Sequence, residues 1–214
     1  MLVSFYQALL RHFGPQRWCP GNTRFEIIVG AILTQNTAWT NVEKAIARLK
    51  AAGALAVAPM EKLSSAGLAE LIRSSGYYRQ KAKKLKAFLE YLRRRYGGSL
   101  GRMFRTPTRQ LRQELLDIHG IGDETADSIL LYGGGRPIFV VDAYTRRILW
   151  RHGLIDPSAS YQDIQDLFQR EIPPDPPVYN EFHALLVRTG KQHCLRSAPL
   201  CQGCPLDRFP HRVE

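Results

Sequence analysis

Hydrophobic residues recur along nearly the whole chain with the spacing of amphipathic helices. The stretch FEIIVGAILTQNTAWTNVEKAIARLK holds an apolar segment, a polar interruption at residues 34–37, and a second amphipathic helix from about 39 to 50. In QKAKKLKAFLEYLRRRYGG, leucines share one helical face and basic residues the other, and the glycine pair at 97–98 ends the helix. We find no internal repeat and no low-complexity segment. The pattern predicts an all-α protein.

The second half of the chain continues the helical pattern with one exception. A short β-branched run, IFVVD, separates two helical stretches, and a proline-rich segment, PPDPPVY, interrupts the pattern near residue 175. Further helices are predicted over residues 108–118, 124–132, 143–153, 161–172 and 180–194.

The charge balance narrows the class of partner. The chain has 30 Lys and Arg against 19 Asp and Glu, a net charge of +11, and such a field attracts polyanions. Charge alone leaves two interpretations open, a nucleic-acid partner or a basic surface without one. The N-terminus is too short and polar for a signal peptide, and no apolar run would span a membrane. We expect a cytoplasmic monomer, associated with the nucleoid if bacterial.

The segment HGIGDETADSILL contains a glycine hairpin between two helices. Gly120 and Gly122 permit a tight turn with bare backbone, and Ile121 would anchor the turn in the core. Unpaired N–H groups at the start of the second helix, where Thr125 lies, suit a phosphate group. The hairpin therefore predicts a DNA phosphate contact, with a ligand-free helical corner as the alternative.

The pattern LxxIxGIGxxTA is similar to the helix-hairpin-helix of the endonuclease III superfamily of DNA base-excision glycosylases. With FEIIVGAILTQNTAW, LIRSSGYYRQKAKKLK and VVDAYTRRI, it most resembles the 3-methyladenine (alkylpurine) branch, over roughly residues 20 to 195. The resemblance implies a two-domain, all-α, endonuclease III-like fold with a C-terminal Cys-rich loop. One domain would be a six-helix domain over 24–134, and the other would combine 1–23 with 135–214. The DNA site would lie in the cleft between them.

The resemblance also assigns chemistry to two positions. Asp142 opens a helix about 20 residues after the hairpin; by itself it reads as an N-cap, but the superfamily has its catalytic aspartate there. Cleavage of an N-glycosidic bond builds positive charge on the sugar, which a carboxylate stabilises while it orients or deprotonates water. Family members that also cut the strand carry a lysine where this chain has Glu124. Because a carboxylate forms no imine, the sequence predicts a monofunctional glycosylase without AP lyase activity.

Candidate pocket residues come from the polar break and from nearby aromatic residues. Gln35 and Asn36 offer amides for a base edge or for the gap in the duplex, although LTQNT also reads as a plain loop. Lys191 is a phosphate contact, a partner of the active site or a solvated lysine. Aromatic residues that would stack on a cationic alkylated base, unless they are core residues, are Trp18, Phe25, Trp39 and Tyr144.

The C-terminal tail reads Cys194, six residues, Cys201, two residues, Cys204. This spacing resembles the first three ligands of the [4Fe-4S] cluster of endonuclease III. Pro210 stands at the position of the fourth cysteine, and His211 follows it. Three alternatives stay open: His211 as fourth ligand, a cluster with one non-protein ligand, or a site without metal; zinc suits the same residues.

The resulting functional prediction is a base-excision-repair DNA N-glycosylase that releases alkylated purines from double-stranded DNA containing damaged bases. One alternative keeps the fold and changes the chemistry, to a bifunctional glycosylase/AP lyase acting on oxidised pyrimidines through another lysine. A second alternative is a non-catalytic DNA-binding module.

Overall fold

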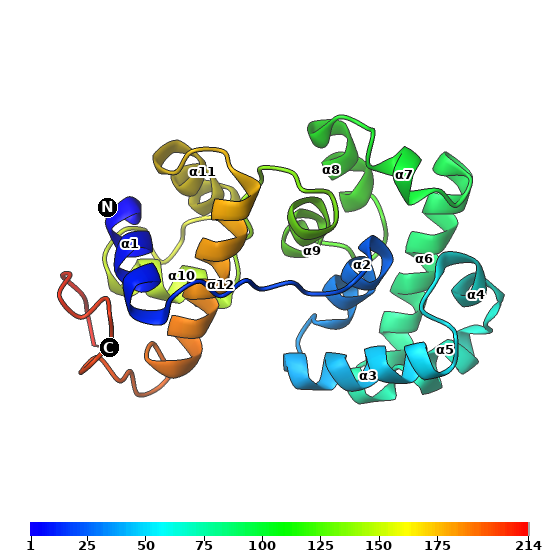
Figure 1. Cartoon of the computed structure of the whole chain (residues 1–214), viewed down its shortest axis with the longest axis horizontal. Helices are drawn as coiled ribbons and strands as arrows, with labels where there is room; N and C mark the ends of the chain where they lie inside the picture. The colour runs from blue at the N-terminus through cyan, green and yellow to red at the C-terminus, as the bar shows by residue number, and fades with distance from the viewer. Residues whose placement is uncertain (214) are drawn as a thin grey trace. The chain divides into compact units, whose positions relative to one another are not determined.

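The computed structural model describes residues 1–213, and its elements are helices joined by loops (Figure 1). No strand occurs within these residues, so the all-α prediction is confirmed. No helix in the described range is long and apolar enough to cross a membrane. In chain order the elements are α1 (Leu2–Phe13), α2 (Arg24–Leu33), α3 (Trp39–Ala51), α4 (Val57–Lys62), α5 (Ser65–Leu71), η1 (Arg73–Ser75), α6 (Tyr78–Tyr96), α7 (Leu100–Met103), α8 (Thr108–Leu116), α9 (Asp123–Ser128), η2 (Ile129–Gly133), α10 (Ala143–Arg151), α11 (Tyr161–Glu171) and α12 (Pro176–Gln192).

The chain divides into two compact units. The middle unit is Cys19–Arg136, and the split unit joins Met1–Trp18 to the described part of Pro137–Glu214. The middle unit therefore holds α2 to η2, and the split unit holds α1 and α10 to α12.

In the middle unit the apolar helix α2 packs against α3, α6, α9 and η2. Because it has neighbours on several sides, Ile28, Val29 and Ile32 are all fully buried. Lys81 of α6 departs from the amphipathic pattern, since it is 2% exposed rather than on the solvated basic face. Its ammonium donates to the carbonyl oxygens of Leu33 (2.9 Å) and Ser75 (2.6 Å). Burial, with the charge of Lys84, lowers the pKa of Lys81 to about 8.

In the split unit α12 packs against both α1 and α10 (Figure 1). The proline-rich segment, which the pattern treats as an interruption, is the start of α12. Asp175 caps the helix through the Val178 N–H at 3.4 Å, and prolines occupy its first two positions, where no N–H is needed.

The β-branched run before Asp142 has no strand partner and is held by side chains instead. Gln165 of α11 donates to the Phe139 carbonyl at 2.6 Å, and the Tyr161 hydroxyl accepts the Val141 N–H at 3.3 Å. The Phe139 ring stacks on Phe168 with centroids 3.7 Å apart. Because backbone and side chains are both fixed, this segment delivers Asp142 to the start of α10 in a defined position.

The helices α10 and α12 approach closely at a glycine. A Cβ atom added to Gly190 would lie 2.4 Å from Cδ1 and 2.8 Å from Cβ of Tyr144, so a side chain has no room there. Arg147 closes the same contact by donating to the Gly190 carbonyl at 3.1 Å. Gly190 therefore sets the separation of the two helices.

We expect Gly190→Ala to lower the free energy of unfolding by roughly 1–3 kcal/mol, because overpacking must push α10 away from α12. Gly101→Ala is the control, since its added Cβ would meet only Ser99 Oγ at 3.8 Å. Urea denaturation measures both variants. Equal stability of Gly190→Ala and the wild type would contradict the close contact.

Candidate functional site

The glycine hairpin of the middle unit joins α8 to α9. Gly120 has φ +84°, a left-handed conformation that favours glycine. Ile118 and Ile121 on either side of it are 7% and 5% exposed, so they anchor the turn in the core as the sequence predicted. Gly122 caps α9 with extended backbone. The turn is thus fixed by its apolar residues and leaves the backbone of Gly122 uncovered.

Arg112 ties the two helices of the hairpin together. Its guanidinium, from α8, donates to both carboxylate oxygens of Asp127 at 2.7 and 3.1 Å and to Asp123 at 2.8 Å. Asp127 is fully buried, and a paired, bidentate carboxylate is the form in which a buried charge is stable. The arginine therefore fixes the angle at which α9 leaves the turn.

Gln35 and Lys84 pack against the hairpin at Gly120 and Thr125. The Gln35 amide nitrogen donates to the Gly120 carbonyl at 3.0 Å and to Thr125 Oγ1 at 2.9 Å, and its oxygen accepts from Lys84 Nζ. The stem of Lys84 lies over Gly120, since an added Cβ would be 2.6–2.8 Å from three of its carbons. The amide predicted to contact a base or the duplex gap is engaged with the hairpin in this structure, and its contact with DNA stays a prediction.

Asp142 in the split unit is the N-cap of α10. Its Oδ1 accepts the Thr145 N–H at 2.7 Å, and its Oδ2 lies 3.6 Å from His183 Nε2. Burial raises the pKa of the Asp142 carboxyl, but the His183 ring, 3.6 Å away, and the N–H of Thr145 outweigh it, so the pKa is lowered. The carboxylate, whose side chain is 12% exposed, is therefore held as an anion. Both the N-cap and the candidate catalytic roles are compatible with this position.

The remaining pocket candidates belong to both units. In the split unit, the Trp18 ring lies 6.3 Å from His183, and Tyr144 packs on Gly190 beneath Arg147, whose guanidinium is 5.1 Å from the ring. In the middle unit, Trp39 packs over Gly30, where an added Cβ would be 3.3 Å from the indole, and Phe25 is 5% exposed. Phe25 is thus a core residue, as the alternative interpretation had it.

Three other predicted residues are exposed. Asn36 adopts a left-handed conformation at φ +52° in the polar break after α2. Glu124 lies in the first turn of α9, and Lys191 lies in the last turn of α12. The residue of α12 beside Asp142 is His183, which is not among the site residues predicted from the sequence. Its helical spacing from Tyr179, Leu186 and Gly190 places it on the buried face of that helix, and this spacing could have indicated it.

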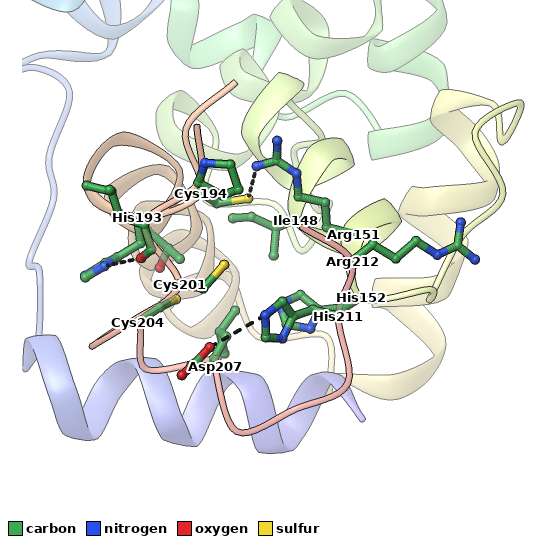
Figure 2. Close-up of a pocket in the computed structure, with 14 residues that line it drawn as sticks. Ile148, Arg151, His152, His193, Cys194, Cys201, Cys204, Asp207, His211 and Arg212 are labelled. Atoms are coloured by element: carbon green, nitrogen blue, oxygen red, sulfur yellow. Dashed lines mark hydrogen bonds and ion pairs between the residues drawn. The ribbon is translucent and has the colours of Figure 1, made fainter. Parts of the chain in front are cut away.

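The cysteine tail forms a second candidate site, within the split unit. Cys194, Cys201, Cys204 and His211 line one small cavity, together with Asp207 (Figure 2). Ligand atoms of Cys201, Asp207 and His211 lie within 4.8 Å of one another. Pro210, at the position of the family's fourth cysteine, offers only its carbonyl, which is 2.9 Å from His152 Nδ1. Cysteine sulfur and histidine nitrogen are the donors that bind zinc and iron–sulfur clusters, so these residues fit such a group.

Arg151 of α10 holds both ends of this tail. It is 5% exposed, and its guanidinium donates to Cys194 Sγ at 3.2 Å and to the carbonyls of Leu195 and Arg196 at 2.6 and 3.1 Å. Its own carbonyl accepts the Arg212 N–H at 2.8 Å. Figure 2 shows the Arg151 guanidinium beside the sulfur of Cys194.

Comparison with known proteins identifies the family of this chain. Residues 29–174 match the model of the HhH-GPD superfamily base excision DNA repair protein. A Methanocaldococcus jannaschii protein, named provisionally as a DNA repair glycosylase, is 45% identical over 211 residues, covering 98% of this chain and 95% of the relative.

Solved structures agree with this match. The H. pylori 3-methyladenine DNA glycosylase bound to 1,N6-ethenoadenine is 29% identical, with a TM-score of 0.73 over 91% of this chain and 96% of that one. Endonuclease III in a non-covalent DNA complex is 23% identical, with a TM-score of 0.83 over 98% and 93% of the two chains, and shows the shared fold.

We expect Gly120→Ala to destabilise the protein by roughly 1–3 kcal/mol, because it strains a left-handed residue and displaces Lys84. Gly122→Ala is the matched control for stability, since that glycine has φ −100° and open space around its Cβ position. Thermal and urea unfolding compare the two. A Gly120→Ala protein as stable as Gly122→Ala would show that neither φ nor Lys84 constrains the turn.

Proposed function

The chain belongs to the HhH-GPD superfamily of base excision DNA repair proteins and is a DNA glycosylase, and on that premise we propose its substrate and mechanism. It releases alkylated purines of the 3-methyladenine type from double-stranded DNA by hydrolysis and leaves the strand uncut. The observation that carries this proposal is the Asp142 carboxylate, which is 12% exposed and held ionised at the start of α10.

Asp142 acts on the sugar and on water. As the N-glycosidic bond breaks, positive charge develops on the deoxyribose, and a fixed, buried anion stabilises that charge more strongly than a solvated one. The second role of the carboxylate is to orient the attacking water and accept its proton. The departing base takes the electron pair of the bond, and water supplies the new C–O bond.

The hairpin supplies sequence-independent DNA binding. The uncovered backbone at Gly122 and the N–H groups of the first turn of α9 receive a phosphate oxygen. Gly120 and Ile121 shape that turn, and the bond from Gln35 to Thr125 steadies it. The net charge of +11 supplies long-range attraction to the duplex.

Glu124 supports a hydrolytic rather than a lyase mechanism. An exposed carboxylate stands where strand-cutting relatives have their lysine, and it cannot attack the sugar to form a Schiff base. Two lysines of α6 are engaged within the protein: Lys84 donates to Gln35, and Lys81 donates to the carbonyls of Leu33 and Ser75. Lys191 is exposed, and we assign it a DNA phosphate contact.

The choice of an alkylated purine rests on chemistry and on one relative. Methylation at N3 or N7 makes the base cationic, which strengthens stacking on aromatic rings and weakens the glycosidic bond. Trp18, Trp39 and Tyr144 are half-buried aromatic candidates for such stacking, with Asn36 as a polar contact. The H. pylori glycosylase, named for 3-methyladenine, resembles this chain over 91% of its length.

The tail residues hold the metal group that the family resemblance implies. We assign Cys194, Cys201, Cys204 and His211 as ligands of a [4Fe-4S] cluster, because these four donors line one cavity and residue 210 is a proline. When bound, the cluster contributes folding energy to the tail rather than a step of base release. Arg151 keeps the loop in place by binding at both of its ends.

We expect the protein to release methylated purines from duplex DNA treated with a methylating agent, with strand breaks appearing only after hot alkali. Asp142→Asn should reduce release by at least about a hundredfold, since it removes the carboxylate, while DNA affinity stays within about twofold. Released bases are measured by chromatography and breaks by denaturing gels. Unimpaired release by Asp142→Asn would overturn the role of the carboxylate.

Borohydride trapping separates hydrolysis from lyase chemistry. The wild type should give no crosslink to abasic-site DNA, whereas Glu124→Lys restores an amine at the hairpin position and should give one. Breaks or a crosslink with the wild type would show a lyase. Release confined to oxidised or mismatched bases would contradict the alkylpurine assignment and leave the glycosylase assignment in place.

We expect purified protein to contain iron and sulfide at about four each per chain and to show the visible absorbance of a cluster. His211→Ala should lose iron and lower the melting temperature, whereas His211→Cys should retain both, because a thiolate replaces the imidazole. One zinc per chain would contradict the cluster and assign the same residues to a Cys₃His site. Equal iron content in His211→Ala would exclude His211 as a ligand.

A further inference from the structure

The α12 histidine beside Asp142 has no role so far. His183 is 7% exposed and lies seven residues, or two helical turns, before Gly190 on the same face of α12. Gly190 fixes the approach of α12 to α10, and Asp142 immediately precedes α10. The backbone contact that lets the helices meet therefore also brings the His183 ring to the carboxylate.

The ring of His183 is held by aromatic neighbours. Its centroid lies 6.3 Å from that of Trp18 and 6.4 Å from that of Phe139, to which it is edge-on. The Trp18 carbonyl accepts the Asn180 amide at 3.1 Å, so the indole segment is tied to the first turns of the same helix. These contacts restrict the imidazole, and Nε2 is directed to Asp142 Oδ2 at 3.6 Å.

The two oxygens of Asp142 thus have different partners. The N–H of Thr145 holds Oδ1 at 2.7 Å, as in any capped helix, while a titratable ring stands at Oδ2. An N-cap needs only the first of these contacts. The second contact limits rotation of the carboxylate and favours its ionised form.

We propose that His183 is a positioning residue for Asp142, orienting its carboxylate and keeping it ionised during base release. This inference rests on the proposed function, since it concerns the same carboxylate. The histidine contacts neither base nor sugar in this mechanism. It acts through Asp142 alone.

Neighbouring elements bring other titratable groups near Asp142. Tyr161 of α11 accepts the Val141 N–H, and Tyr144 lies on α10. His183 is the group whose ring nitrogen lies 3.6 Å from Asp142 Oδ2. If it is removed, burial of Asp142 is no longer offset by an imidazole, so the pKa of the carboxyl should rise.

The decisive experiment compares wild type, His183→Leu and His183→Gln in single-turnover base release from methylated duplex DNA, across pH 5 to 8.5. We expect His183→Leu to release base roughly tenfold more slowly near pH 7, because the carboxylate loses an orienting partner. The acid limb, which is the low-pH side of the plot of release rate against pH, should move to higher pH. Gln keeps a polar N–H, and should restore most of the rate but not the position of the acid limb. DNA affinity should stay within about twofold in both.

A second readout does not depend on activity. Carbon-13 NMR of labelled aspartate, with Asp142→Asn to assign the signal, follows the carboxyl titration directly, and we expect a higher midpoint in His183→Leu. An unchanged midpoint with an unchanged acid limb would overturn the proposal. So would a folded His183→Leu protein whose rate falls equally at every pH. If the wild type releases no base but the midpoint moves as expected, the proposed function fails and the positioning effect stands.

Discussion

The close approach of α10 and α12 at Gly190 is the constraint on which the split unit depends. A side chain at that position would meet the Cβ of Tyr144, so the two helices can reach their observed separation only with glycine there. The approach of His183 to Asp142 and the bonds from Arg147 to Gly190 and Cys194 depend on that separation. The chemistry assigned to the carboxylate is therefore built on a packing contact between two helices.

A glycine and a hydrogen-bonded lysine also determine the structure of the hairpin. Gly120 serves two purposes, because it turns the chain at positive φ and leaves room for the Lys84 stem. Lys84 then holds Gln35, and Gln35 holds the turn through the Gly120 carbonyl and Thr125. Lysines that would be solvated on a lone amphipathic helix thus become structural. Part of the positive charge of this chain therefore lies on lysines that are bonded within the protein.

The tail shows how one buried arginine organises a loop that has little regular structure of its own. Arg151 binds the carbonyls of Leu195 and Arg196 near the first cysteine and accepts the N–H of Arg212 near the last candidate ligand. The loop between these bonds carries the three thiols and the imidazole that line one cavity. The guanidinium of Arg151 also donates to Cys194 Sγ at 3.2 Å.

Much of this protein could be read from its sequence, because local patterns determine local structure. The helical periodicity, the glycine pair of the hairpin, the N-cap at Asp142 and the spacing of three cysteines depend on residues close in the chain. The superfamily followed from those same motifs, and the matched family model confirms it. What the sequence left undecided were contacts between residues distant in the chain. The pairing of His183 with Asp142, the burial of Lys81 and the bond from Lys84 to Gln35 arise only when helices pack. Periodicity identifies the face of a helix that is buried, but only tertiary packing decides which polar atom meets which partner there.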